Sequence, residues 1–476
     1  MFTFLISIVL LIVGYFTYGK FVERVYGIDE EKQTPAYEKN DGVDYLPIEW
    51  KKASLIQLLN IAGLGPIFGP IMGALWGPVA FIWIVLGSIF AGAVHDYFSG
   101  MLSMKHGGAS LPGIVGKYLG NGMRIFVNGF ALILLVLVGT VFMTGPAKLL
   151  ADMTTGWMTL SVWAGIILVY YIIATMLPVD KIIGRFYPAF GALLLIMAFG
   201  VGAGLLIQGY QIPELTLANM HPDALPIWPL LFITIACGAI SGFHATQSPI
   251  MARCTQNEKY GRKIFYGMMI GEGIIAMIWA AAGMTFYGDY ATLATVINEA
   301  GPAGVVKEVA TTLLGAVGGT LAVLGVIILP ITSGDTAFRS ARMLIADFAK
   351  LPQKEFPKRL MIAIPLFVVG YMLTKIDFNF LWRYFAWANQ TTAMIMLWAA
   401  AVYLLQNKKL HWVASIPAAF MTIVTFTYIL MAEEGLKLAT SIAYPLGFAL
   451  ALIPMGLFAR KVLQNNGTAK TENKSL

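Results

Sequence analysis

Two ionisable side chains stand inside long apolar stretches of the sequence. His244 lies in the segment SGFHATQSP, and Glu272 lies in GMMIGEGIIAMIWAA. Ionisable groups within such stretches are costly and rare, so they usually have a function. An imidazole titrates near neutral pH, and a buried carboxyl group can exchange its proton in the same range. The sequence predicts that His244 and Glu272 exchange protons. The alternative for each is a structural group, bonded to freed backbone or permanently protonated.

Two neighbouring hydroxyl residues suggest a different ion. Thr332 and Ser333 follow a proline in the segment ILPITSGD. Hydroxyl oxygens are ligands for hard cations such as Na⁺, but in membrane helices they also bond to backbone carbonyls. Both readings stay open for this pair. The coupling ion is therefore H⁺ or Na⁺, and we favour H⁺ because two ionisable candidates exist.

Two further charged pairs lie near the ends of apolar stretches. His95 and Asp96 close one stretch, and Asp335 and Arg339 are spaced to share one face of a helix. Such groups near a membrane interface are more often structural or gating than in contact with a ligand. We predict gating roles for these four residues, with Asp335 and Arg339 forming a salt bridge at the cytoplasmic edge.

Motifs for catalysis or metal binding are missing from the sequence. It contains no GxSxG, HExxH, Walker A or dinucleotide fingerprint. Its two cysteines, Cys237 and Cys254, lie in neither a CxxC motif nor a His-rich cluster. We therefore expect no enzyme, no cofactor, no metal site and no transport driven by ATP within this chain.

The composition indicates a chain that is mostly embedded in lipid. Hydrophobic residues make up 58% of the 476 positions and charged residues 12%, and the mean hydropathy is +0.74. A soluble domain carries about 25% charged residues because water must wet its surface. The 32 Lys and Arg residues lie in short links between apolar runs, without a basic face. This distribution argues against a nucleic-acid partner.

The apolar runs predict an all-α polytopic membrane protein with thirteen transmembrane helices. About 20 apolar residues cross a bilayer as a helix. We expect the first run to be a retained helix, because it has no basic n-region or cleavage site of a signal peptide. The predicted spans are 2–19, 53–75, 77–100, 123–146, 160–177, 186–208, 225–251, 264–287, 311–338, 359–374, 379–405, 412–431 and 439–459.

The distribution of basic residues predicts the orientation. With the N-terminus outside, 27 of the 32 Lys and Arg residues fall on the inside, and five fall outside. Cytoplasmic loops carry such an excess, and a wrong number of spans would scramble it. We therefore predict an inner-membrane protein with its N-terminus outside and its C-terminus in the cytoplasm.

Two predicted spans contain glycine and proline where a helix should be continuous. The second reads LLNIAGLGPIFGPIMGAL, and the seventh reads ITIACGAISGFHATQSPIMAR. We predict non-helical segments at 63–66 and 241–246 that meet near mid-membrane, within about 10 Å of each other. Such backbone must line a protein-enclosed or watery cavity. The alternative is close helix packing through small residues.

The spacing of the two breaks predicts an inverted repeat of five plus five helices. They are five spans apart and enter from opposite sides, as such a repeat requires. The repeats would cover 53–208 and 225–405, with a leading helix at 2–19 and two C-terminal helices within 412–459. All of these lie in one transporter domain over 1–476.

The helix ends at the breaks suggest what binds there. Gly65 and Pro66 look like the start of one half-helix, and Ser248 and Pro249 look like the start of another. Such positive ends favour an anion such as a carboxylate, although unwound carbonyls could hold a cation. The predicted substrate-binding residues are Gly63, Gly65, Pro66, Ser241, Gly242, His244, Gln247, Asn389 and Gln390.

Six blocks of the sequence resemble the carbon starvation protein A family: GLGPIFGP, FAGAVHD, SGFHATQSPIMARC, FYGMMIGEGIIAMIWA, SGDTAFRSAR and LWRYFAWANQTTA. They run in order from about residue 50 to 395. The resemblance implies an inner-membrane carrier associated with uptake of pyruvate and, less directly, of peptides. It also implies kinship with the amino acid–polyamine–organocation superfamily and its LeuT-like fold. In that fold the first and sixth core helices are unwound at the substrate, and hydroxyls of the eighth can hold sodium. These positions correspond here to 63–69, 241–247 and the pair Thr332 and Ser333.

Together these patterns predict a secondary transporter that imports a small carboxylate, pyruvate first, by cation symport. A transporter of short peptides is the alternative within the same class. A membrane sensor of a metabolite is the alternative from another class. The sequence does not determine an oligomeric state.

Overall fold

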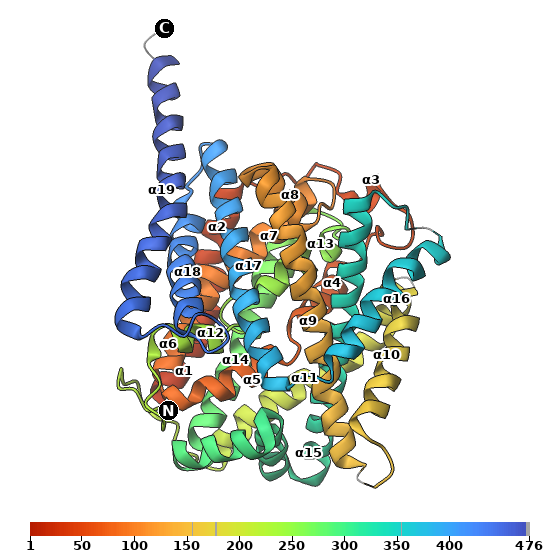
Figure 1. The fold of residues 1–476 in the computed structure, drawn as a ribbon, viewed down its shortest axis with the longest axis vertical. Helices are drawn as coiled ribbons and strands as arrows, with labels where there is room; N and C mark the ends of the chain where they lie inside the picture. Colours follow the sequence, from red (N-terminus) through yellow and green to blue (C-terminus); the bar gives the residue numbers. More distant parts are fainter. Residues whose placement is uncertain (155, 177–178, 354, 473–476) are drawn as a thin grey trace.

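The computed structural model describes residues 1–154, 156–176, 179–353 and 355–472. This part of the chain is a bundle of helices, with a single isolated β-bridge between Ile48 and Thr255. The predicted all-α class is confirmed. The two termini lie at opposite ends of the bundle (Figure 1), as an odd number of spans requires. Which end faces the cytoplasm stays a prediction.

The helices follow the apolar runs of the sequence. The N-terminal half contains α1 Phe2–Phe16, α2 Tyr18–Tyr26, α3 Pro35–Glu38, α4 Trp50–Ile61, α5 Gly65–Gly73, α6 Val79–Leu86, the π-helical turn η2 Gly87–Gly92, α7 Ala93–Lys105, α8 Leu111–Leu119, α9 Asn121–Met153, α10 Leu160–Met176 and α11 Val179–Ile207. The C-terminal half contains α12 Ile227–Thr234, α13 Gly242–Ala252, the π-helical turn η4 Arg262–Tyr266, α14 Gly267–Thr285, α15 Tyr290–Ala349, α16 Phe356–Leu373, α17 Phe378–Gln406, α18 Trp412–Met431 and α19 Thr440–Glu472. Short 3₁₀ turns lie at η1 Ala74–Trp76 and η3 Glu258–Tyr260.

The number of helices that can cross a membrane is close to the prediction but does not establish it. Ten helices in the described residues are long and apolar enough, and the bent pair α4 and α5 makes eleven. The predicted spans 160–177 and 225–251 correspond to the shorter helix α10 and to the separate helices α12 and α13. Thirteen spans and the inverted repeat therefore stay predictions.

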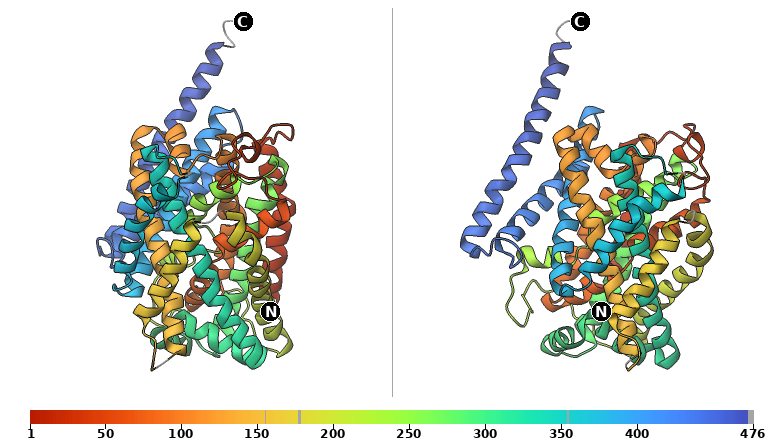
Figure 2. Two further views of the ribbon diagram at one scale, coloured as in Figure 1. Left: turned by 90° about the vertical axis from the view of Figure 1, so that its right-hand side faces the viewer. Right: turned by 45° about the vertical axis from the view of Figure 1, so that its right-hand side comes forward.

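The link between the predicted spans 264–287 and 311–338 is itself helical from Tyr290 onward. Its place outside the membrane stays a prediction. Two glycines interrupt it, Gly301 with φ +73° and Gly315 with φ +70°. A left-handed residue of this kind ends a helix at little steric cost when it is glycine. The short helices before Gly315 lie at the same end of the bundle as the N-terminus (Figures 1 and 2).

Burial separates central helices from helices at the lipid boundary. The most apolar stretch of α17 is 100% buried. The most apolar stretch of the α1–α2 segment is 28% buried, and that of α19 is 22% buried. Exposed side chains such as Ile6 and Leu452 are apolar, as expected where a helix faces hydrocarbon. The helices α5, α13, α14 and α17 form the interior that carries the candidate site.

Candidate functional site

The first break separates α4 from α5, whose axes differ by 48°. It consists of residues 62–64, and its backbone is partly satisfied locally: Ala62 N–H donates to Leu58 O at 2.7 Å, and Gly63 N–H donates to Ile61 O at 3.0 Å. Gly65 and Pro66 begin α5, as predicted for the start of a half-helix. The predicted non-helical range 63–66 is therefore two residues too long at its end.

The second break separates α12 from α13 and consists of residues 235–241. Gly238 has φ +90°, a conformation that glycine adopts readily. The predicted range 241–246 is wrong beyond Ser241, which caps α13, because 242–246 are helical. Pro249 lies inside α13, so the prediction that Ser248 and Pro249 begin a helix is also wrong. The chain leaves the helix after Thr234, well before the proline.

Side chains from other helices satisfy the carbonyls of the second break. Trp83 Nε1–H of α6 donates to Ile235 O at 3.0 Å, and Ser88 Oγ–H of η2 donates to Gly238 O at 2.7 Å. Unpaired backbone groups are expensive in a medium without water. These two side chains therefore help to make a non-helical segment tolerable in the interior of the bundle.

Asn389 and Gln390 of α17 hold the two ends of the same break. Phe243 N–H donates to Asn389 Oδ1 at 2.6 Å, and Asn389 Nδ2–H donates to Ser241 Oγ at 3.0 Å. Gln390 Nε2–H donates to Phe232 O at 3.1 Å. The structure therefore places both predicted polar residues of α17 at the second break, where they bind its backbone and cap.

The two breaks touch each other, as predicted. A Cβ atom placed on Gly65 would lie 2.3 Å from Cβ and Sγ of Cys237. A Cβ atom placed on Gly238 would lie 3.8 Å from Pro66 Cα. Only residues without side chains allow this approach. The meeting point of the breaks is hereafter called the junction, and it consists of residues 62–66 and 235–244.

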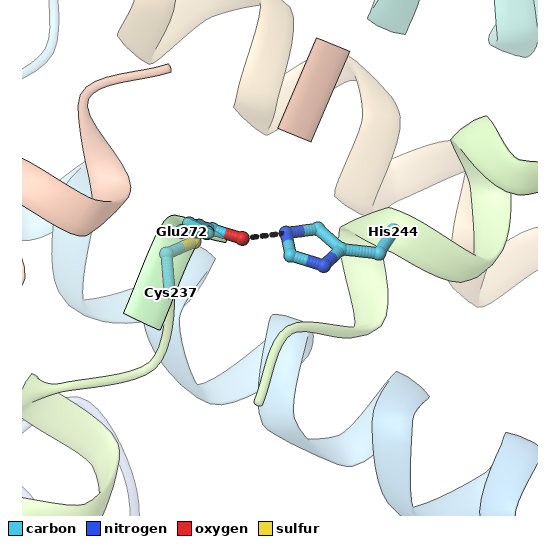
Figure 3. A group of neighbouring side chains, drawn as sticks. All are labelled: Cys237, His244 and Glu272. Atoms are coloured by element: carbon cyan, nitrogen blue, oxygen red, sulfur yellow. Dashed lines mark ion pairs between the residues drawn. The ribbon is translucent and has the colours of Figure 1, made fainter. Parts of the chain in front are cut away.

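A chain of four ionisable groups ends at the junction. His244 Nδ1 lies 2.8 Å from Asp96 Oδ2, and His244 Nε2 lies 3.3 Å from Glu272 Oε2. Asp96 Oδ1 lies 2.8 Å from Nδ1 of His95. All four side chains have 0% exposure. Figure 3 shows the His244 ring pointing at the Glu272 carboxyl group, with Cys237 beside it.

The geometry of this chain allows one proton to be shared. Asp96 can accept hydrogen bonds from Nδ1 of both histidines, so Nε2 of His244 faces Glu272. A proton between these two groups gives either imidazolium and carboxylate or neutral imidazole and carboxylic acid. Neither oxygen of Glu272 accepts a hydrogen bond of normal geometry among the described residues. A buried carboxylate with so few partners is unstable without a neutralising charge.

Close helix approaches bring this chain to the second break. A Cβ atom on Gly92, which ends the π-helical turn η2, would lie 2.2 Å from Ala239 O. A Cβ atom on Gly273 of α14 would lie 2.5 Å from Ser88 Oγ. Turns of π-helix are frequent at functional sites, and this one comes immediately before the helix that carries Asp96. The predicted gating role for Asp96 therefore understated its position, since it directly contacts His244.

Three side chains at the junction could also hold a metal ion. Cys237, His244 and Glu272 offer sulfur, nitrogen and oxygen atoms within 4.8 Å of one another, a donor set that zinc accepts. The sequence analysis predicted no metal site, because Cys237 lies in no ligand motif. His244 Nε2 and Glu272 Oε2 also lie 3.3 Å from each other, so the same atoms can share a proton or bind an ion.

The hydroxyl pair of α15 lies near the first break. Ser333 Oγ–H donates to Leu59 O at 3.1 Å, and Thr332 Oγ1–H donates to Leu329 O at 2.7 Å. A Cβ atom on Gly63 would lie 3.0 Å from Ser333 Oγ. Both hydroxyls therefore serve backbone carbonyls, and their role as sodium ligands stays a prediction.

The remaining predicted residues lie on the contact between α15 and its neighbours. Asp335 and Arg339 are each 1% exposed, and no ion pair within 4 Å joins them in the described part of the chain, so the predicted salt bridge between them is not formed there. Arg339 Nη2–H instead donates to Ala174 O at 2.6 Å. Gln247 Nε2–H donates to Ser340 Oγ at 3.2 Å. Gln247 therefore binds α15 and not the centre of the junction.

Comparison with known proteins identifies the family of the chain. The family model described as carbon starvation protein CstA matches residues 1–163, 152–312 and 291–428. A membrane protein of Haemophilus influenzae is 48% identical over 62% of this chain and 94% of its own length. The peptide transporter CstA of Escherichia coli is 25% identical over 88% of this chain and 79% of its own length.

Two further similarities are more distant. The pyruvate/proton symporter BtsT of Escherichia coli is 26% identical over 61% of this chain and 50% of its own length. A solved structure of a manganese transporter from Eremococcus coleocola aligns with a TM-score of 0.53 and 11% identity, over 90% of this chain and 98% of that one. This second likeness concerns the fold alone. Because the family model matches most of the sequence, the chain belongs to the carbon starvation protein CstA family.

Proposed function

We propose that this protein is a secondary transporter that imports a small carboxylate, pyruvate first, by symport with protons. The observation that carries the proposal is the contact between His244 and Glu272 at the junction of two broken helices. Membrane transporters commonly bind substrate and coupling ion at such interruptions. The relatives named as transporters support transport, not catalysis.

The buried chain explains why we favour protons over sodium. Glu272 is fully buried, and its Oε2 lies 3.3 Å from Nε2 of the His244 ring, which is charged when it is protonated. When His244 and Glu272 share one proton, adding a second gives imidazolium and carboxylic acid. Removing the shared proton leaves a neutral imidazole and a negative charge on Glu272 that His244 does not compensate. Each protonation state carries a different net charge, and a buried charge is stable only beside compensating groups. Proton exchange can therefore be linked to a change in helix arrangement. The hydroxyls of Thr332 and Ser333 already donate to backbone carbonyls.

The helix ends at the junction favour a carboxylate as substrate. The half-helices α5 and α13 both begin there, at Gly65 and Gly242. The N-terminal end of a helix attracts anions through its dipole and the N–H groups that remain free; in α13 the Phe243 N–H is already bonded to Asn389 Oδ1. Pyruvate carries one carboxylate on a small skeleton, and one relative is named as a pyruvate/proton symporter.

Short peptides are the second candidate substrate. Two relatives named peptide transporter CstA match 92% and 88% of this chain. A peptide also carries an α-ammonium group, for which the carboxyl groups of Asp96 and Glu272 offer partners. A peptide and pyruvate therefore make opposite demands on the same residues.

Competition in proteoliposomes distinguishes these candidates. With the interior more alkaline than the exterior, labelled pyruvate should accumulate, and unlabelled pyruvate should abolish the signal while alanyl-alanine leaves it unchanged. Uptake of labelled dipeptide with no effect of pyruvate would overturn the carboxylate assignment. Preloaded substrate should also drive counterflow if the protein is a transporter. A sensor binds its ligand without moving it and would show no counterflow.

A further inference from the structure

A groove opens between α1, α4 and α14, away from the junction. It has a volume of about 510 Å³, which lies in the range of sites for small organic molecules. Most of its lining is apolar. Ile12 and Tyr15 come from α1, and Met268, Ile270 and Ile274 come from α14.

One end of this groove is basic. Lys51 and Lys263 line it together with Trp50, and the two ammonium groups lie 5.9 Å and 4.2 Å from the Trp50 ring centroid. Neither lysine forms an ion pair with a carboxylate in the described part of the chain. By contrast, the neighbouring Arg262 is paired with Glu23 at 2.9 Å. The groove therefore presents two positive charges that protein carboxylates leave uncompensated.

A buried hydroxyl group lies between the basic end and the apolar wall. Ser54 lines the groove and is 6% exposed, yet its Oγ has no hydrogen-bond partner in the described residues. A hydroxyl in a membrane helix normally bonds to a carbonyl of the preceding turn. The Ser54 Oγ is thus available to a polar group that enters the groove from outside the chain.

We infer that this groove is a binding site for an anionic phospholipid. The phosphate would lie at Lys51 and Lys263, an ester or phosphate oxygen would bond to Ser54, and an acyl chain would cover the apolar wall. Basic pockets between transmembrane helices recognise anionic lipid headgroups. The tryptophan at the same end is the residue expected at headgroup level.

The site lies beside the helix that carries the junction carboxyl group. Gly271, which lines the groove, directly precedes Glu272 in α14. A Cβ atom on Gly271 would meet only Leu58 Cδ1, at 3.8 Å, which is an ordinary contact. A larger side chain at this position therefore fills the groove without a clash at its first atom, and it replaces a residue that is unfavourable in helices.

Native mass spectrometry of the purified full-length protein tests the inference. After incubation with phosphatidylglycerol or phosphatidylcholine, the unchanged protein should retain one phosphatidylglycerol in preference to phosphatidylcholine. The double variant Lys51→Gln/Lys263→Gln should bind phosphatidylglycerol about 30-fold more weakly, because each lysine contributes about 1 kcal/mol to binding an anionic lipid. Gly271→Leu should lower retention while keeping both charges. The matched control Lys20→Gln/Lys32→Gln removes two exposed lysines outside the groove and should leave retention unchanged.

Two results would overturn the lipid site. The first is equal retention of both lipids, or of neither, by the unchanged protein. The second is undiminished phosphatidylglycerol binding in both the lysine and the Gly271→Leu variants when their thermal unfolding matches that of the unchanged protein. If one of these variants has a lowered melting temperature, the lipid binding of the other variant provides the test. The lysine variant removes charge from the groove, and Gly271→Leu removes volume from it.

Discussion

The two helix breaks at the junction are built differently. The first consists of three residues, 62–64, and relies on local backbone bonds and one hydroxyl of α15. The second consists of seven residues, 235–241, and has, besides local backbone bonds such as that from Ile240 N–H to Ala236 O, bonds to side chains from α6, η2 and α17. The first break is therefore a local bend, whereas the second is a segment that other helices hold in place.

This difference indicates which break sets the geometry of the proton site. The second break leads directly into α13, whose third residue is His244. Asn389 fixes the start of that helix, and Asp96 orients the His244 ring against Glu272. Changes at the second break should therefore disturb stability and transport more than comparable changes at the first.

The largest effect is expected for Gly242→Ala. A Cβ atom there would lie 2.1 Å from Asn389 O and 2.5 Å from Ala393 N. These are backbone atoms and cannot rotate away, so α13 and α17 must separate. We expect a loss of about 3 kcal/mol in the free energy of unfolding, visible as a lower melting temperature in detergent.

Two glycine variants serve as comparisons for Gly242→Ala. At the first break, a Cβ atom on Gly63 would meet side-chain atoms of Phe142 at 2.7 Å. A side chain can shift, so Gly63→Ala should cost only about 1 kcal/mol. In α9, nothing lies within 4 Å of a Cβ on Gly129, so Gly129→Ala should not destabilise the protein. Equal effects at Gly242 and Gly63 would contradict the difference between the breaks.

An intermediate effect is expected for Asn389→Ala. The substitution removes the acceptor for Phe243 N–H and the donor to Ser241, and the buried N–H group is then left without its partner. Such a loss costs about 2 kcal/mol. Transport should fall more than stability, because the start of α13 positions His244. Asn389→Asp keeps an acceptor oxygen and should recover part of both losses, and failure of both to recover would argue against the capping role.

The smallest effect is expected for Ser333→Ala at the first break. It removes a single hydrogen bond to Leu59 O, which is worth about 1 kcal/mol. Uptake should keep its dependence on the pH gradient. A strongly raised requirement for sodium in uptake assays of Ser333→Ala and Thr332→Ala would instead assign the hydroxyl pair to a sodium site.

Much of the architecture could be predicted from the sequence because hydrophobic length follows from the thickness of the bilayer. The approximate place of both breaks was also predictable, since Gly65 and Pro66 are typical of a helix start and Gly238 readily leaves helical geometry. The exact first and last residues of each break could not be predicted. Pro249 looked like a helix start, but a proline two turns inside a helix gives the same sequence signal.

The partners across the site could not be predicted in the same way. The sequence showed that His244 and Glu272 were buried candidates, but it placed Asp96 at the end of another span. Its contact with His244 depends on how α7 packs against α13. Cys237, Trp83 and Ser88 were missed because each sits in an ordinary apolar run, and only the packing brings them to the junction.

The central claim is that the pair His244 and Glu272 couples uptake to protons, and one transport measurement tests it most directly. In proteoliposomes with a gradient of about one pH unit, one proton per pyruvate allows up to about tenfold accumulation. Glu272→Gln should abolish this accumulation and spare pyruvate exchange, because the amide resembles the protonated carboxyl group. The control Glu308→Gln removes an exposed carboxylate bonded to Tyr287 and should accumulate normally. Uptake that depends on sodium at fixed pH and is indifferent to Glu272→Gln and His244→Gln would contradict the account.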